Sequence, residues 1–197
     1  RNTIMNKIKK SYKEYQYFIM IDTNEYSCIG DIDINVLEKY LVRDDWDALS
    51  FNRDAGYYDT WALSFGYLIY SFLHFRNSNY VGNLIRNTIS KILNNMDKNK
   101  LLKVYSAYNG FSIYRTNKFI NCTYSHHVPI KYMPRNVLKL NFLLCKSVPK
   151  LNIKHGDCEH RSFHMEAIFK NNARIMVSPL SLFKKFKNLP RNLRGPA

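Results

Sequence analysis

The stretch Tyr17-Phe18-Ile19-Met20-Ile21-Asp22-Thr23-Asn24 is the most informative part of this sequence. Five apolar residues that end in a carboxylate are typical of a buried parallel strand. Such a strand delivers its last side chain to the carboxyl edge of the sheet, where open α/β sheets bind their ligands. The stretch therefore predicts an α/β fold with a functional carboxylate at Asp22.

The spacing of Asp22 and Asn24 suggests a site for a hard cation, because two oxygen ligands two residues apart can reach one ion from the same side. Mg²⁺ and Mn²⁺ favour such ligands and keep positions open for phosphates. Taken alone, Asp22 is more typical of a cap or turn, and the neutral Asn24 should weaken metal binding. The sequence Asp31-Ile32-Asp33 has the same spacing but follows Gly30, which favours a helix cap or a secondary site.

The remaining pattern predicts a sheet flanked by helices. Strands are expected at 17–21, 48–52, 101–108, 111–114 and, ended by Pro179, at 174–177. Helices are expected at 2–15, from Asp31 or Asp33 through Val42, from Ser78 or Asn79 onward, and at 158–170. Residues 120–156 read as irregular, and 61–75 fit either a strand or a helix. We expect one domain over 1–183 and a mobile basic tail over 184–197. Because Asp22 comes so early, the sheet is expected to lack its first strands.

Composition sets the broad class. The 197 residues are 46% hydrophobic, which supports a globular core. No apolar run is long enough for a transmembrane helix, and the four cysteines lack metal-binding spacing, so they are read as reduced.

The net charge is +15, yet ten of the fifteen acidic residues lie between Asp22 and Asp59. A basic body around an acidic island suits a polyanionic ligand beside a divalent cation, although a solvated basic surface fits equally well. No nucleic-acid partner is expected, because zinc-finger spacing, an aromatic RNA-binding signature and a basic helix with heptads are all missing.

A second constellation lies at Asp157-Cys158-Glu159-His160-Arg161-Ser162-Phe163-His164. It opens a predicted helix and places a carboxylate beside an imidazole, which is a plausible general-base pair. An ordinary acidic first turn that complements the helix dipole is the simpler reading. The residues leave open whether Glu159 or His160 acts as the base.

Three segments together resemble GT-A glycosyltransferases. They are Arg1-Asn2 with the helix and strand up to Asp22-Thr23-Asn24, then Asn109-Gly110-Phe111-Ser112-Ile113-Tyr114-Arg115, then Glu159-His160-Arg161-Ser162-Phe163 with the Lys170–Ile175 segment. Asn172 stands where that family commonly has Gly, consistent with a left-handed helix end. Within the superfamily, the Tyr57–Leu63 segment looks most like the small soluble glycosyltransferases that large DNA viruses of algae and amoebae use on capsid glycans.

The resemblance implies a Rossmann-like GT-A mixed sheet and an inverting transfer of a sugar from a UDP- or GDP-sugar to a glycan or glycoprotein. Asp22 and Asn24 would ligate Mn²⁺ or Mg²⁺, with His155 and His164 as possible extra ligands. The base motif contains Asp157, Glu159 and His160. The residues expected to contact substrate are Arg1, Tyr58, Asp59, Trp61 and Gly110, and core packing is an equally good reading for Trp61. A cytoplasmic location is expected, in the host cell if the protein is viral.

Two other readings stay open. A degenerate GT-A domain that binds its ligand without turnover fits the neutral Asn24. A basic nucleic-acid-binding protein fits the net charge, but the acidic island argues against it.

Overall fold

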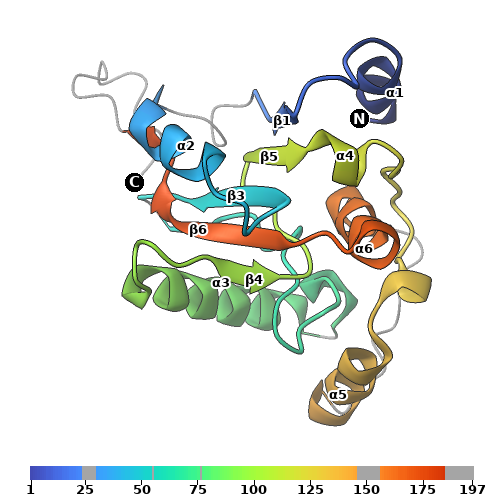
Figure 1. Ribbon diagram of the computed structural model, residues 1–197. Helices are drawn as coiled ribbons and strands as arrows, with labels where there is room; N and C mark the ends of the chain where they lie inside the picture. Colours follow the sequence, from blue (N-terminus) through green and yellow to red (C-terminus); the bar gives the residue numbers. More distant parts are fainter. Residues whose placement is uncertain (24–29, 55, 76, 146–155, 185–197) are drawn as a thin grey trace.

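The computed structural model describes residues 1–23, 30–54, 56–75, 77–145 and 156–184, so the predicted ligands Asn24 and His155 lie outside the described residues. A five-stranded sheet with the order β1-β5-β3-β6-β4 forms the centre of the molecule (Figure 1). The strands are β1 (Tyr17–Ile21), β2 (Asp31–Ile32), β3 (Ala48–Asn52), β4 (Leu102–Val104), β5 (Phe111–Arg115), β6 (Ile175–Ser181) and β7 (Phe183–Lys184). β2 and β7 pair separately as a small two-stranded sheet.

The helices are α1 (Asn2–Ser11), α2 (Ile34–Leu41), α3 (Ser78–Asn95), α4 (Thr116–Phe119), α5 (Arg135–Cys145) and α6 (Glu159–Asn171), with short 3-10 turns η1 (Phe72–His74) and η2 (Ile130–Tyr132). Among the described residues, no helix combines the length and apolar character needed to cross a membrane, in agreement with the sequence prediction.

The strand directions give a mixed sheet. β3 and β6 run parallel, whereas β1 with β5, β3 with β5 and β4 with β6 are antiparallel. The sheet therefore confirms the predicted α/β class and is compatible with a Rossmann-like fold.

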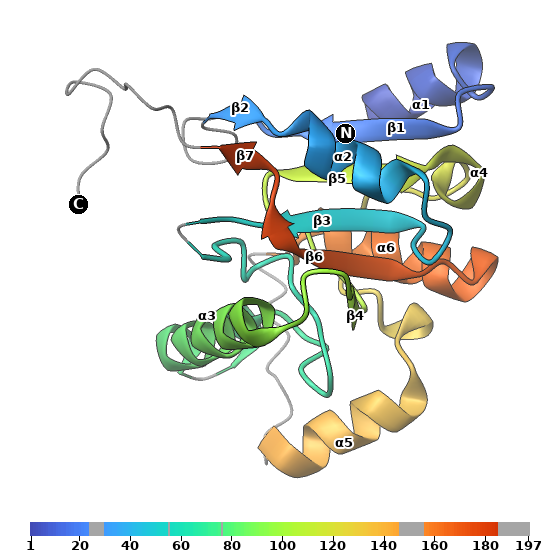
Figure 2. The same ribbon diagram turned by 60° about the vertical axis from the view of Figure 1, so that its left-hand side comes forward.

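The two faces of the sheet are covered by different helices because side chains alternate along each strand. Leu49 and Phe51 of β3 face the α2 side, where they form a core with Tyr40 and Trp46. The larger core on the opposite face gathers residues from α1, α3, α4 and α6. Figure 2 shows α2 in front of the sheet and α6 behind it.

The prediction that residues 17–21 form a buried parallel strand is wrong in two respects. β1 is antiparallel to β5 and stands at the end of the strand order. Only alternate side chains are covered: Phe18 and Met20 are buried, whereas Ile19 and Ile21 are 47% and 43% exposed. An apolar run alone does not distinguish an edge strand from a central one, because sheet position depends on pairing far along the chain.

Several predicted boundaries also need correction. The first helix ends at Ser11 rather than Tyr15, so that the chain can turn into β1. Helix α5 lies within the stretch predicted to be irregular and begins directly after Pro134, a residue suited to a helix start. β6 continues past Pro179 to Ser181, because the register against β3 shifts there and a bulge tolerates proline.

Other predicted segments fell short. In the 101–108 stretch only Leu102–Val104 is a strand. This strand, β4, is at the edge of the sheet next to β6 and is separated from β5 by β3 and β6. The undecided stretch 61–75 is mostly irregular, with one 3-10 turn. Lys184 pairs with Asp31 in β7, while the rest of the predicted tail, 185–197, lies outside the described residues.

Two local predictions are confirmed at helix ends. Asp33 caps α2, and its carboxylate accepts a hydrogen bond from the backbone N–H of Asn35 at 3.2 Å. Asn172 ends α6 with φ 51°, the left-handed conformation that asparagine tolerates.

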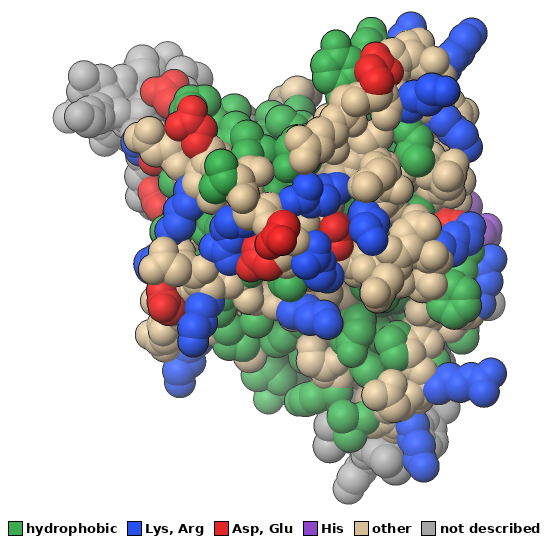
Figure 3. All heavy atoms as spheres, viewed as in Figure 1, with side chains coloured by type: hydrophobic (Ala, Val, Ile, Leu, Met, Phe, Trp, Pro, Cys, Tyr) green, Lys and Arg blue, Asp and Glu red, His purple; other side chains and the backbone are tan. Residues whose placement is uncertain are grey.

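Several carboxylates of the acidic island are paired with basic side chains in space. Asp47 lies 3.0 Å from the Arg174 guanidinium and 3.8 Å from that of Arg115, and Asp45 pairs with Arg43 at 2.6 Å. Figure 3 shows acidic and basic side chains side by side near the middle of the visible face. The local excess of acids therefore does not by itself mark a cation site.

Candidate functional site

The centre of the candidate site is Arg1, whose guanidinium joins two carboxylates from distant parts of the chain. Its Nη2 donates to Asp22 Oδ1 and its Nε donates to Glu159 Oε1, each at 2.8 Å. α1 begins just after Arg1, Asp22 follows the end of β1, and Glu159 begins α6. The side chains of Asp22 and Glu159 are 29% and 32% exposed, so a ligand can reach both.

Asp22 is held by the strand next to β1 and by a tyrosine. Its backbone N–H donates to the carbonyl of Gly110 at 2.8 Å, which extends the β1–β5 ladder. The hydroxyl of Tyr108 donates to Asp22 Oδ1 at 3.1 Å and also lies 3.2 Å from the Gly110 carbonyl. Because burial raises the pKa of Tyr108, its hydroxyl stays protonated and acts as a donor.

His160 lies in the same cluster but cannot reach solvent. Its ring stacks on Tyr108 with centroids 3.7 Å apart and meets Tyr124 edge-on at 5.4 Å. The residue is 2% exposed, and neither ring nitrogen has a hydrogen-bond partner among the described residues. Burial lowers its pKa well below the usual range, so the imidazole is neutral. Of the two candidate bases, the geometry therefore favours Glu159, and His160 supports Tyr108.

Asp59 brings a third carboxyl group toward the cluster. Its Oδ1 accepts the backbone N–H of Ala62 at 3.1 Å. Desolvation raises the pKa of Asp59 to about 7, against the effect of this hydrogen bond, and the charges of Asp22 and Glu159 raise it further. Asp59 is therefore electrostatically coupled to Asp22 and Glu159.

The raised pKa of Asp59 makes stability depend on pH. Because the folded-state pKa of about 7 exceeds the reference value of 3.8, the contribution of this group is fully present below pH 3.8 and is lost as pH rises toward 7. Asp59→Asn, which keeps the acceptor for Ala62, should gain stability relative to the wild type over this range, by up to about 4 kcal/mol. Urea unfolding of both proteins between pH 4 and pH 8 measures the difference. If the difference in unfolding free energy between Asp59→Asn and the wild type stays constant with pH, the raised pKa of Asp59 is contradicted. The control is Asp54→Asn at an exposed position, which should leave the unfolding free energy unchanged.

Asn109 fixes the loop that carries two predicted substrate-binding residues. Its Oδ1 accepts the backbone N–H groups of Tyr58 and Asp59, both at 3.2 Å, while its Nδ2 donates to the Phe51 carbonyl at 3.0 Å. The Tyr58 ring faces the guanidinium of Arg53 at 5.2 Å. Asn109 thus ties the loop to the end of β3.

We call the residues that surround the arginine the Arg1 cluster: Arg1, Asp22, Tyr108, Glu159 and His160. Asp157 is not part of this cluster. Its carboxylate is fully buried and pairs with the guanidinium of Arg161, which is also fully buried. Arg161 donates in addition to Ser64 Oγ at 2.8 Å and to the Trp61 carbonyl at 2.6 Å. This network anchors the 61–64 segment to α6, and it leaves the Trp61 side chain 40% exposed.

His164 is also separate from the carboxylates. Its Nδ1 lies 3.0 Å from Ser106 Oγ and its Nε2 lies 3.1 Å from the Tyr114 hydroxyl, so both nitrogens are engaged. Burial lowers the pKa of His164 to about 3. Within the described residues, no group of three or more His, Cys, Asp or Glu side chains is arranged to hold a metal ion. Asp22 is a partly exposed carboxylate just after β1, and its Oδ1 is paired with Arg1.

Sequence reasoning missed several residues that build the site. Tyr108 and Asn109 precede the predicted Gly110, and this Tyr-Asn-Gly order was the available signal. Tyr124 has no comparable signal, because it approaches Arg1 only through the fold, with the guanidinium 5.9 Å from its ring. Arg161 was quoted within the base motif, but nothing local indicated its burial.

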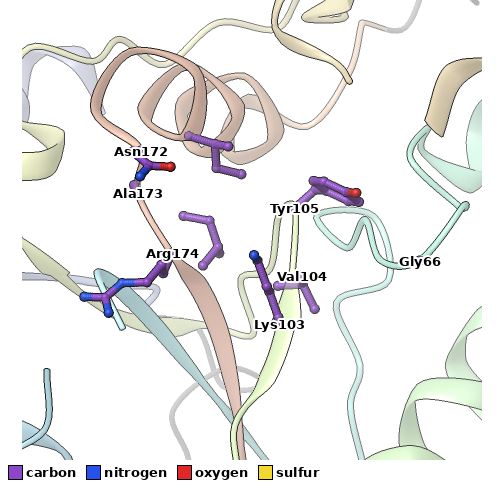
Figure 4. Close-up of a pocket in the computed structure, with 9 residues that line it drawn as sticks. Gly66, Lys103, Val104, Tyr105, Asn172, Ala173 and Arg174 are labelled. Carbon is purple, nitrogen blue, oxygen red and sulfur yellow. The ribbon is translucent and has the colours of Figure 1, made fainter. Parts of the chain in front are cut away.

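A cavity lies away from this cluster, between β4, β6 and the end of α6 (Figure 4). It has a volume of about 380 Å³ and is lined by Gly66, Lys103, Val104, Tyr105, Ile168, Asn172, Ala173, Arg174 and Ile175. The Lys103 side chain points into it, while Arg174 points away. Its wall mixes aliphatic and polar side chains and includes none of the Arg1 cluster.

Comparison with protein-family models, curated proteins and solved structures found no match for this chain. The fold itself therefore defines the class: an α/β protein with a mixed five-stranded sheet flanked by helices. The site adds an arginine that joins carboxylates from the end of a strand and the start of a helix.

Proposed function

We propose that this protein is a metal-dependent glycosyltransferase with a GT-A arrangement, which moves a sugar from a nucleoside-diphosphate sugar to a hydroxyl acceptor with inversion. The observation that carries the proposal is the Arg1 bridge between Asp22 and Glu159. The two residues were selected from separate motifs as metal ligand and base, and they lie on either side of one guanidinium.

In this mechanism each residue of the cluster has a chemical role. Asp22 would hold Mn²⁺ or Mg²⁺ together with the donor phosphates, and the ion would stabilise the negative charge of the leaving diphosphate. Glu159 accepts the proton of the acceptor hydroxyl, whose oxygen bonds to the anomeric carbon as the bond to the diphosphate breaks. Arg1 and Tyr108 keep the two carboxylates in place.

The proposal is tested by the release of nucleoside diphosphate from UDP- and GDP-sugars with Mn²⁺ or with EDTA. We expect release that requires the metal. Thermal stabilisation by nucleotide sugar without any release would instead indicate the binding module, a reading that the pairing of Arg1 with both carboxylates also permits. Strongly salt-dependent binding to random DNA or RNA, with no effect of nucleotide sugar, would contradict both readings.

The choice of base gives a sharper test. Glu159→Gln should lower kcat by about 10²- to 10⁴-fold, the usual size of a general-base contribution. His160→Phe keeps the ring that stacks on Tyr108 and should retain turnover close to that of the wild type. Steady-state kinetics at saturating donor compare the two variants. If His160→Phe is the inactive one, the assignment of the base is wrong.

A further inference from the structure

A cavity of about 440 Å³ lies between α6 and the segment 123–132. Its lining from α6 consists of Ser162 and Glu166, and the rest comes from that segment. None of the functions described above uses this cavity.

The two walls of the cavity are joined by hydrogen bonds. Glu166 Oε2 accepts the backbone N–H of Thr123 at 2.8 Å and its hydroxyl at 3.2 Å. Glu166 Oε1 accepts the hydroxyl of Tyr132 at 3.3 Å. Because one buried carboxylate holds both ends of the segment against α6, the cavity is a fixed part of the fold.

Two elements link the cavity to the Arg1 cluster, namely α6 and the chain around Tyr124. Ser162 follows Glu159 by three residues on α6, so the two side chains lie on the same side of the helix, about 5–6 Å apart at their Cβ atoms. Across the cavity, Tyr124 is flanked by the lining residues Thr123 and Ser125, and its ring faces Arg1. The lining residue Ser162 therefore lies within one helical turn of the proposed base Glu159.

The lining combines groups that suit a carbohydrate. Thr123, Ser125 and Ser162 supply hydroxyls, and His127 supplies an imidazole; Val128, Pro129 and Ile130 add an apolar surface. A sugar ring has hydroxyls at its rim and an apolar C–H face, so it matches both kinds of contact. The volume lies in the range of small-molecule sites. The cavity in Figure 4 includes no residue of α6 before Ile168, so it lies farther along the helix from Glu159.

We propose that this cavity is the acceptor subsite and binds a saccharide whose reacting hydroxyl points toward Glu159. The inference rests on the proposed function for the direction of the acceptor, but the binding of a saccharide can be measured without turnover.

Binding is tested by saturation-transfer NMR with the methyl glycosides of glucose, galactose, mannose and xylose. We expect at least one glycoside to bind the wild type, and both Ser162→Leu, which fills the cavity, and His127→Ala to weaken that binding at least fivefold. His127 is exposed, so its variant does not depend on tolerance of the fold. Lys103→Ala, in the cavity of Figure 4, is the control and should bind within twofold of the wild type.

The proposal is overturned if no glycoside binds the wild type. It is also overturned if His127→Ala and folded Ser162→Leu bind the glycoside as tightly as the wild type does. Failure of the proposed function looks different, because the wild type would then release no nucleoside diphosphate. Where turnover is present, the ratio of sugar transfer to donor hydrolysis should fall at least tenfold in His127→Ala.

Discussion

Asp22→Asn is expected to lower metal-dependent turnover by on the order of 10³-fold, because the loss of a ligating carboxylate removes several kcal/mol of stabilisation of the leaving group. Asparagine keeps an oxygen that can accept from Arg1 and Tyr108, so the local geometry should survive. The loss then reports the charge that binds the cation. Nucleoside-diphosphate release at several Mn²⁺ concentrations measures it.

The matched control for this prediction is Asp31→Asn, in the other Asp-x-Asp sequence. Asp31 is exposed in β2 and should leave turnover unchanged. Equal losses in the two variants would mean that the effect is not specific to the end of β1. Undiminished turnover in Asp22→Asn would refute the role of Asp22 as a metal ligand.

Arg161→Met is expected to lower the free energy of unfolding by about 3–5 kcal/mol, because removal of one partner leaves a buried charge uncompensated. The residue left behind is Asp157, whose side chain is fully buried. The substitution also removes the donor to Ser64 and to the Trp61 carbonyl. Urea unfolding followed by circular dichroism measures the change.

The same substitution at an exposed helical arginine, Arg86→Met on α3, should change stability by less than about 0.5 kcal/mol. Replacing both partners, as in Arg161→Met with Asp157→Leu, should recover part of the loss, since it removes the unpaired charge. A single variant as stable as the wild type would show that the buried pair does not hold the 61–64 segment.

Much of the local structure was predictable from short-range patterns. The start of α6 follows from its acidic first turn, and the capping role of Asp33 follows from its place before an apolar helical stretch. The sequence also predicts the 48–52 strand, and the structure buries all five of its residues. Helix α5 was missed because its flanking prolines suggested a loop, although Pro134 marks the start of the helix.

The candidate site was predictable only as a set of residues. Asp22, Glu159, Asp59 and Gly110 were each named from the sequence, and the fold brings them toward Arg1. His164 and Asp157 were named by the same reasoning, yet their polar atoms bind other buried partners. Residue type and spacing do not distinguish these cases, because each depends on what the fold packs around the side chain.

The sequence by itself determined that β1 is an apolar strand followed by Asp22 and that Glu159 opens a helix, because strands and helices follow from patterns over a few residues. Only the tertiary structure decided that β1 is an antiparallel edge strand and that Arg1 joins Asp22 to Glu159, 158 positions from Arg1. It also decided that Glu159 stays partly exposed while His160 is buried and neutral. The physical reason is that strand pairing, ion pairing and desolvation depend on distances in space, which the local sequence does not contain.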